Sequence, residues 1–275
     1  MPELPETETI ARDLDASVRG HTIVGVTVTR PDVLRHVTPQ QLADRIAGAR
    51  IERCWRRAKL VVLDLSTGDR LVVQPRFTGA LLLDAGQLPE RERAYSTLAL
   101  TLDDGRRLHY RDIRRLGTVA LMSPERFQAY TDRLGPEPLD PHFTDDQLAG
   151  LLRSSRQAVK KVLMDQRRVV GVGNIYANEA LWRAGIDPSR PARSVSEAEA
   201  ARLHAAIRAV LAESIAERGT SFRDYVDASG SAGRFTARLQ AYGRGGAPCT
   251  RCGDPLAESH AIDGRTTVWC PRCQT

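Results

Sequence analysis

The hydrophobic pattern changes its period once along this chain, and that change most limits the possible folds. Up to about residue 132, short β-rich runs alternate with turn signals such as "STGD" and "DDGR". A proline-rich stretch, "RLGPEPLDPHFT" (133–144), then breaks both the strand and the helix period. Beyond it, apolar residues recur at helical spacing. The pattern predicts a β-rich domain, a linker and a helical domain.

The first part of the chain combines one helix with many strands. The segment 6–20 places Ile10, Leu14 and Val18 on one helical face, and Gly20 can end the helix. Strand signals then cover residues 21–30, 50–65, 70–84, 95–112 and 115–122. Many strands in series predict a sandwich or a barrel-like β domain.

The second part is predicted to be helical. Helical spacing covers residues 145–155, 156–166, 175–185 and 194–219, and the last of these begins with a capping box from Ser196 to Glu199. A glycine turn, "VVGVGN", separates the second and third helices. Residues 220–235 form a polar, glycine-bearing loop of functional length.

Four of the five cysteines lie near the end of the chain, in two C-x-x-C pairs. The pairs are separated by 17 residues, which is the spacing of a zinc ribbon. Four thiolates close the coordination shell, so we expect one structural Zn²⁺ ion, held by Cys249, Cys252, Cys270 and Cys273. Cys54 has no such partner, and we expect it to pack in a strand.

The charge balance is compatible with a nucleic-acid partner. Forty Lys and Arg residues against 34 Asp and Glu residues give a net charge of +6. The acidic start has no apolar signal region, and no apolar run reaches the ~18 residues of a membrane helix. We therefore expect a cytoplasmic protein with no membrane partner.

The opening "MPELPETETI" permits two interpretations. Proline and acidic residues suit the first turn of a helix, and this alone explains the composition. Alternatively, removal of Met1 would leave Pro2 with a free secondary amine, which is a nucleophile near neutral pH. Attack on an aldehyde-level carbon would give an iminium ion, with Glu3 beside it as an acid or base.

The motifs, in order, resemble the formamidopyrimidine-DNA glycosylase/endonuclease VIII family of base-excision repair enzymes. The resemblance runs over nearly the whole chain and rests on "PELPETET", "RRAK", "DIRRLG", "LGPEPL", "DQRRVVGVGNIYANEALWRAGIDP", "LQAYGR" and the cysteine hairpin. It implies an α+β fold with an N-terminal helix and a two-layer β-sandwich. A helix–two-turn–helix domain and a zinc-finger hairpin follow. We accordingly expect domains at 1–132 and 145–240, a linker at 133–144, and a zinc finger at 241–275.

The resemblance also implies a catalytic set. Pro2 would attack C1′ of the damaged nucleotide and displace the base, and Glu3 would protonate the sugar ring oxygen. The iminium would then allow β- and δ-elimination, which leaves a one-nucleotide gap. Lys59, in "RRAK", would contact the phosphate of the lesion. Without the resemblance, Lys59 would be a solvated strand lysine.

Other positions are expected to contact DNA. By resemblance, Gly173 and Asn174 in the glycine turn, Arg115, and Arg265 at the tip of the zinc hairpin bind phosphates. Arg114 would read the base opposite the lesion. The chain departs from the family at two positions: Phe77 stands where methionine is usual, and Leu116 replaces phenylalanine. Phe77 would then plug the space of the flipped base, unless it is a core residue of its strand.

The expected substrate is damaged double-stranded DNA carrying 8-oxoguanine or formamidopyrimidines. The 220–235 loop resembles in length the loop of family members that cap a flipped oxidised purine, and this resemblance implies a preference for oxidised purines. An endonuclease VIII-like preference for oxidised pyrimidines is the alternative. A non-catalytic binder of damaged DNA is a third hypothesis, against which the intact Pro2, Glu3 and Lys59 argue. We expect a bacterial monomer that associates with the nucleoid through DNA and uses no nucleotide cofactor.

Overall fold

The chain folds into two units that are each built from two segments of sequence. The computed structural model describes residues 2–275. The first unit contains the residues up to Asp132 together with Glu217–Arg234, and the second contains Arg133–Ala216 with Phe235–Thr275. The loop segment 217–234 therefore packs with the N-terminal part of the chain, although it follows a helix of the second unit.

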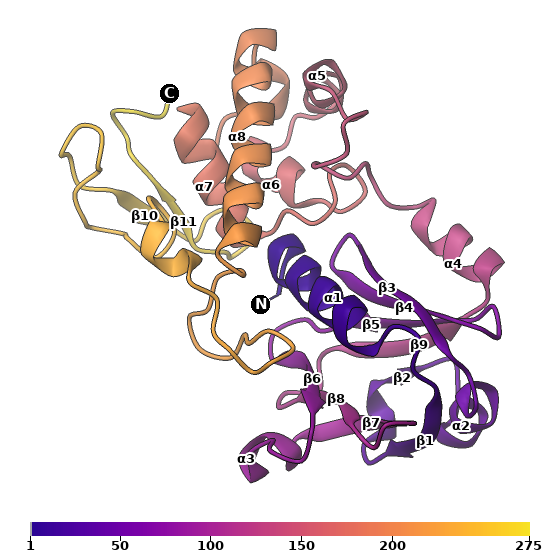
Figure 1. Cartoon of the computed structure of the whole chain (residues 1–275). Helices are drawn as coiled ribbons and strands as arrows, with labels where there is room; N and C mark the ends of the chain where they lie inside the picture. Colours follow the sequence, from indigo (N-terminus) through magenta and orange to yellow (C-terminus); the bar gives the residue numbers. More distant parts are fainter. Residues whose placement is uncertain (1) are drawn as a thin grey trace. The chain divides into compact units, whose positions relative to one another are not determined.

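The first unit is a sandwich of two mainly antiparallel sheets (Figure 1). One sheet has the order β1 (Ile23–Val28), β7 (Ser96–Leu102), β8 (Arg107–Asp112), β6 (Gly79–Asp84). The other has the order β2 (Leu34–Arg35), β9 (Thr118–Met122), β5 (Arg70–Gln74), β4 (Leu60–Leu65), β3 (Ile51–Arg57). Only the short β2–β9 pairing is parallel among these strands. All five predicted strand regions are confirmed. Regions 50–65 and 95–112 each contain a complete hairpin, whereas region 70–84 contains β5 and β6, which lie in different sheets.

Helix α1 (Leu4–Val18) covers the five-stranded sheet and packs against β3 and β4 (Figure 1). Its predicted apolar face is confirmed, because Ile10, Leu14 and Val18 are completely buried in the core between the sheets. The shorter helices α2 (Pro39–Ile46), α3 (Glu90–Arg93) and α4 (Pro124–Thr131) were not predicted, since their apolar stripes span no more than two turns.

The second unit begins with four helices and ends with a hairpin (Figure 1). The helices are α5 (Asp145–Arg153), α6 (Val159–Met164), α7 (Asn174–Ala184) and α8 (Glu197–Ala216). The capping box of α8 is confirmed: Ser196 N donates to a Glu199 carboxylate oxygen at 2.8 Å, and Glu199 N donates to Ser196 Oγ at 3.3 Å. Strands β10 (Ala257–Ser259) and β11 (Thr267–Trp269) form the terminal hairpin. The predicted α+β class is therefore confirmed.

Across residues 2–275, no helix combines the length and the apolar composition that a bilayer span requires.

Candidate active site and DNA-binding surfaces

The N-terminal residues precede helix α1 rather than forming its first turn. The helix begins at Leu4, so Pro2 lies outside it and Pro5 is the proline of its first turn, where proline is tolerated. Glu3 is the N-cap, is almost fully buried, and donates its N–H to the Glu6 carboxylate at 2.8 Å. Helix initiation therefore explains Pro5 and Glu6 but leaves Pro2 without a role in the helix. The predicted removal of Met1 lies outside the described residues, because the structure describes residues 2–275.

Lys59 lies in the two-residue turn between β3 and β4. Ala58, beside it, has a φ of +54°, which is unusual for a residue with a side chain. The strand before the turn is joined to helix α1, because Arg56 on β3 contacts the Glu8 carboxylate at 2.7 Å. The guanidinium of Arg56 counteracts burial and lowers the pKa of Glu8. This ion pair fastens the helix that follows Pro2 to the strand that leads to Lys59.

Phe77 and Arg114 lie together on an exposed surface of the first unit. The Phe77 side chain is 43% exposed in the turn between β5 and β6, so it is not a core residue of a strand. The guanidinium carbon of Arg114 lies 5.2 Å from the centroid of its ring. Leu116, on the same loop as Arg114, is 38% exposed. Large apolar side chains at this exposure are candidates for contact with a partner.

Buried hydrogen bonds hold the two loops that carry these side chains. The Asp112 carboxylate accepts a hydrogen bond from Thr78 Oγ1 and another, at 2.8 Å, from Gly117 N. Thr78 Oγ1 in turn accepts the N–H of Arg114 at 3.0 Å. These hydrogen bonds therefore join the β5–β6 turn, which carries Phe77, to the β8–β9 loop, which carries Arg114.

Arg115 is exposed and pairs with Asp32. The two charged groups are 3.0 Å apart, and about half of each side chain is accessible to water. An exposed pair of this kind contributes little to stability. A phosphate can therefore replace Asp32 as the partner of the Arg115 guanidinium with little loss of stability.

The loop 217–234 is anchored on the first unit by residues that sequence reasoning missed. The Glu6 carboxylate accepts the N–H of Thr220 at 2.8 Å. Tyr225 is 3% exposed in the core, and Arg218 bridges the carboxylates of Asp13 and Asp227. The acidic "PETET" start was a visible signal for Glu6. No local pattern indicated that it would bind a loop more than 200 residues away.

Hydrogen bonds within the loop hold Asp227 in its ionised form. Burial opposes ionisation, but the Ser229 hydroxyl, the Ser231 N–H and the Arg218 guanidinium together lower the pKa of Asp227. The tip of the loop is therefore ordered around one buried carboxylate.

In the second unit, the glycine turn leads directly into helix α7. Gly171 has a φ of +78°, Gly173 is the N-cap, and Asn174 is the first helical residue. Gln166 braces the turn: its amide donates to Val172 O at 2.9 Å, and its oxygen accepts the Gly171 N–H at 2.8 Å. Asn174 is half-buried at a helix N-terminus, where backbone N–H groups and the helix dipole favour an anion.

Helix α7 also carries a buried carboxylate that sequence reasoning missed. Glu179 is completely buried and accepts the backbone N–H groups of Gln240, Ala241 and Tyr242 at 2.8–2.9 Å. Burial raises the pKa of Glu179, and the three N–H groups oppose this effect. The contact fastens the "LQAYGR" segment, which leads to the first cysteine pair, onto the helix.

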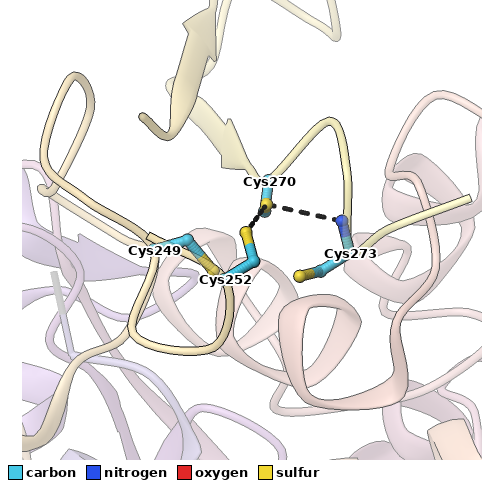
Figure 2. Close-up of side chains that lie close together, drawn as sticks. All are labelled: Cys249, Cys252, Cys270 and Cys273. Carbon is cyan, nitrogen blue, oxygen red and sulfur yellow. Dashed lines mark hydrogen bonds between the residues drawn. The ribbon is translucent and has the colours of Figure 1, made fainter. Parts of the chain in front are cut away.

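The four cysteines of the C-x-x-C pairs converge beside the β10–β11 hairpin (Figure 2). Their sulfur atoms all lie within 4.8 Å of one another. A tetrahedral zinc–thiolate site has Zn–S bonds of about 2.3 Å, which corresponds to S–S separations of about 3.8 Å. The group therefore fits one such ion. Arg265 lies in the exposed loop between β10 and β11, and Cys54 is buried on β3, as predicted.

Comparisons with known proteins agree with this geometry. The family profile described as "Formamidopyrimidine-DNA glycosylase N-terminal domain" matches residues 1–119. The one described as "Formamidopyrimidine-DNA glycosylase H2TH domain" matches residues 134–225. The chain belongs to the formamidopyrimidine-DNA glycosylase family.

Curated members of the family match over their whole length. The formamidopyrimidine-DNA glycosylase of Heliobacterium modesticaldum is 43% identical, with 100% of both chains covered. That of Pelotomaculum thermopropionicum is 41% identical, over 100% of this chain and 99% of its own.

Solved glycosylase structures show the same fold. The MutM (Fpg) protein of Thermus thermophilus superposes with a TM-score of 0.87 at 38% identity, over 99% of this chain and 98% of its own. The Lactococcus lactis Fpg, in a complex with DNA containing N7-benzyl-Fapy-dG, superposes with a TM-score of 0.91 at 32% identity, over 100% of both chains.

Proposed function

We propose that this chain is a bifunctional DNA glycosylase and abasic-site lyase that removes 8-oxoguanine and formamidopyrimidines from duplex DNA. The observation that carries this function is membership of the glycosylase family over the full length, together with the retained Pro2–Glu3 start. Similar solved structures are described as complexes with Fapy-dG-containing DNA and with abasic-site DNA. The chain acts as a monomer on its DNA substrate.

Pro2 is the nucleophile of the proposed mechanism. Once Met1 is removed, the secondary amine attacks C1′ of the damaged nucleotide, and the base leaves with the electron pair of the glycosidic bond. Opening of the sugar ring, with a proton from Glu3, gives an iminium ion on Pro2. The iminium acidifies the C2′ hydrogens, so elimination expels the 3′ phosphate and then the 5′ phosphate. The position of Glu3 directly after Pro2 supports this role.

Four positions are proposed to hold the DNA backbone. Lys59, Arg115 and Arg265 each bring a positive charge, and Asn174 lies with Gly173 at the N-terminus of α7. Their exposed or half-buried side chains support contact with phosphates.

Two surfaces are proposed to recognise the lesion. Phe77 fills the space left by the flipped base, Arg114 reads the opposite base, and Leu116 pries at the neighbouring step. The anchored loop within 220–235 covers the flipped purine. The proposed domain limits remain 1–132, 145–240 and 241–275, with a linker at 133–144.

The metal is proposed to be one structural Zn²⁺ ion held by Cys249, Cys252, Cys270 and Cys273. Four sulfur ligands leave no open position, so the ion supports the hairpin and takes no part in the chemistry.

A comparison of substrates tests this function. The protein is given matched duplexes containing 8-oxoguanine, thymine glycol or a preformed abasic site. We expect strand cleavage at 8-oxoguanine and at the abasic site, and much slower cleavage at thymine glycol. Faster cleavage at thymine glycol would assign an endonuclease VIII-like preference for oxidised pyrimidines. Binding without cleavage of any duplex would identify a non-catalytic DNA-binding protein.

A further inference from the structure

Lys160 on helix α6 is a completely buried lysine that points to the zinc hairpin. Its side chain is 0% exposed. The ammonium group donates to Thr266 O at 2.7 Å and to Thr267 Oγ1 at 2.8 Å. A buried ammonium is costly and is kept only where polar groups surround it. Two of those groups belong to the residues that directly follow Arg265.

The contact reaches the backbone of Arg265 itself. Thr267 is 1% exposed, and its hydroxyl, which accepts from Lys160, donates to Arg265 O at 3.1 Å. A continuous chain of hydrogen bonds therefore runs from α6 to the residue at the hairpin tip.

Asn178 on helix α7 makes a second connection to the same strand. Its side chain is 1% exposed, and its oxygen accepts the N–H of Val268 at 2.7 Å. Its amide donates to Asn174 O at 2.6 Å and approaches Thr266 O at 3.4 Å. One buried side chain thus joins the first turn of α7 to β11.

We infer that Lys160 and Asn178 are positioning residues that fix the position of Arg265 relative to Asn174. Arg265 and Asn174 can then both contact the backbone of the same DNA strand. This inference rests on the proposed phosphate contacts of Asn174 and Arg265. The hairpin strands have only three residues each, and the loop between them is largely exposed. An arginine on such a loop would lose conformational freedom on binding. Anchoring the loop beforehand removes part of that cost.

A neighbouring lysine provides a matched control. Lys161 also contacts the hairpin, through an ion pair with Asp263 at 2.7 Å, but its side chain is 41% exposed. An exposed ion pair of this kind does little to fix the position of the hairpin loop. Lys160→Met and Lys161→Met therefore remove the same charge from adjacent positions, and only the first removes a buried anchor.

The test is a set of double-mutant cycles on the zinc-loaded protein, with a duplex that contains a tetrahydrofuran abasic analogue. Lys160→Met, Asn178→Ala and Thr267→Val are each combined with Arg265→Ala, and binding is measured over a range of salt concentrations. Each single variant should bind about five- to tenfold more weakly, but less than twofold more weakly when Arg265 is already alanine. Lys161→Met should stay within about twofold of the parent protein.

Separate outcomes distinguish the possibilities. The inference would be overturned if the variants weakened DNA binding as much in the Arg265→Ala background as in the parent protein. Unchanged DNA binding by Thr267→Val and Asn178→Ala would also overturn it. A fall in melting temperature without a change in binding would mean that the residues are only structural. Because the readout is binding, absence of lyase activity in the parent protein would count against the proposed function and leave the cycle interpretable.

Discussion

The guanidinium of Arg114 lies over the ring of Phe77, 5.2 Å from its centroid, although the two residues belong to different loops. A cation over an aromatic face contributes about 0.5–1 kcal/mol at an exposed site. The contact also limits the orientations of the ring. Phe77, which is proposed to fill the space of the flipped base, and Arg114, which is proposed to read the opposite base, therefore form one surface, and a change in one should alter the other.

Phe77→Ala should slow excision from an 8-oxoguanine pair far more than cleavage of a preformed abasic site. Base–aromatic stacking contributes roughly 1–3 kcal/mol, and only the intact lesion requires extrusion of a base. Single-turnover rates on the two duplexes measure the difference. The melting temperature should stay nearly constant, since the side chain is exposed. A large loss of thermal stability with an equal fall in both rates would contradict this role.

A form of the protein that retains Met1 should lose strand cleavage. An amide nitrogen at Pro2 is not nucleophilic, so no iminium can form. Borohydride trapping on a lesion duplex measures the covalent adduct and should fall with cleavage. Pro2→Gly, which keeps an α-amine, is the comparison and should retain some trapping. Undiminished cleavage by the blocked form would exclude Pro2 as the nucleophile.

Cys249→Ser should remove the metal and weaken DNA binding. Metal binding at such a site is worth on the order of 10 kcal/mol of local folding free energy. Cys249 also packs with Trp182, Leu256 and Val268, so its loss should loosen the hairpin that carries Arg265. Zinc content and affinity measure the effect. Cys54→Ala, which changes a buried cysteine outside the cluster, should keep one zinc ion per chain.

Arg265→Ala should make the salt dependence of DNA binding shallower. Each phosphate contact made by a cation contributes about −0.9 to the log–log slope, so the loss of one contact should change the slope by roughly one. Affinity measured between low and moderate salt gives the value. An unchanged slope would remove Arg265 from the set of phosphate contacts.

Glu199→Gln should destabilise the second unit at neutral pH but not in strong acid. The hydrogen bond from Arg190 lowers the pKa of Glu199 to about 2, from 4.5. The stabilisation is therefore complete above the unfolded pKa near 4.5 and is lost as the pH falls toward about 2. Its size is at most about 3 kcal/mol.

Thermal unfolding between about pH 2 and pH 7 measures this effect. Glu197→Gln is the control, since Glu197 lies in the same helical turn but its side chain is 81% exposed. The two variants should differ at neutral pH and converge in acid. A constant difference would mean that the charge of Glu199 is not the source.

The sequence by itself determined those helices, strands and ligand sets that depend on interactions between nearby residues. The stripe of Ile10, Leu14 and Val18, the capping box at Ser196 and the strand runs each depend on neighbours a few residues away. The spacing of the cysteine pairs likewise sets a metal site within two tight turns. Family resemblance added expectations for Pro2, and they remain for experiment to test.

Only the tertiary structure decided which distant groups meet. Glu6 and Thr220 are separated by 214 positions, and Lys160 and Thr267 by 107, so no periodic pattern connects either pair. The 217–234 segment packs with the first unit because Tyr225 is buried in that core. Likewise, Phe77 is apolar and follows a strand, and only the turn at Arg76–Thr78 directs it to the surface. Such contacts depend on the path of the whole backbone, which a local pattern does not encode.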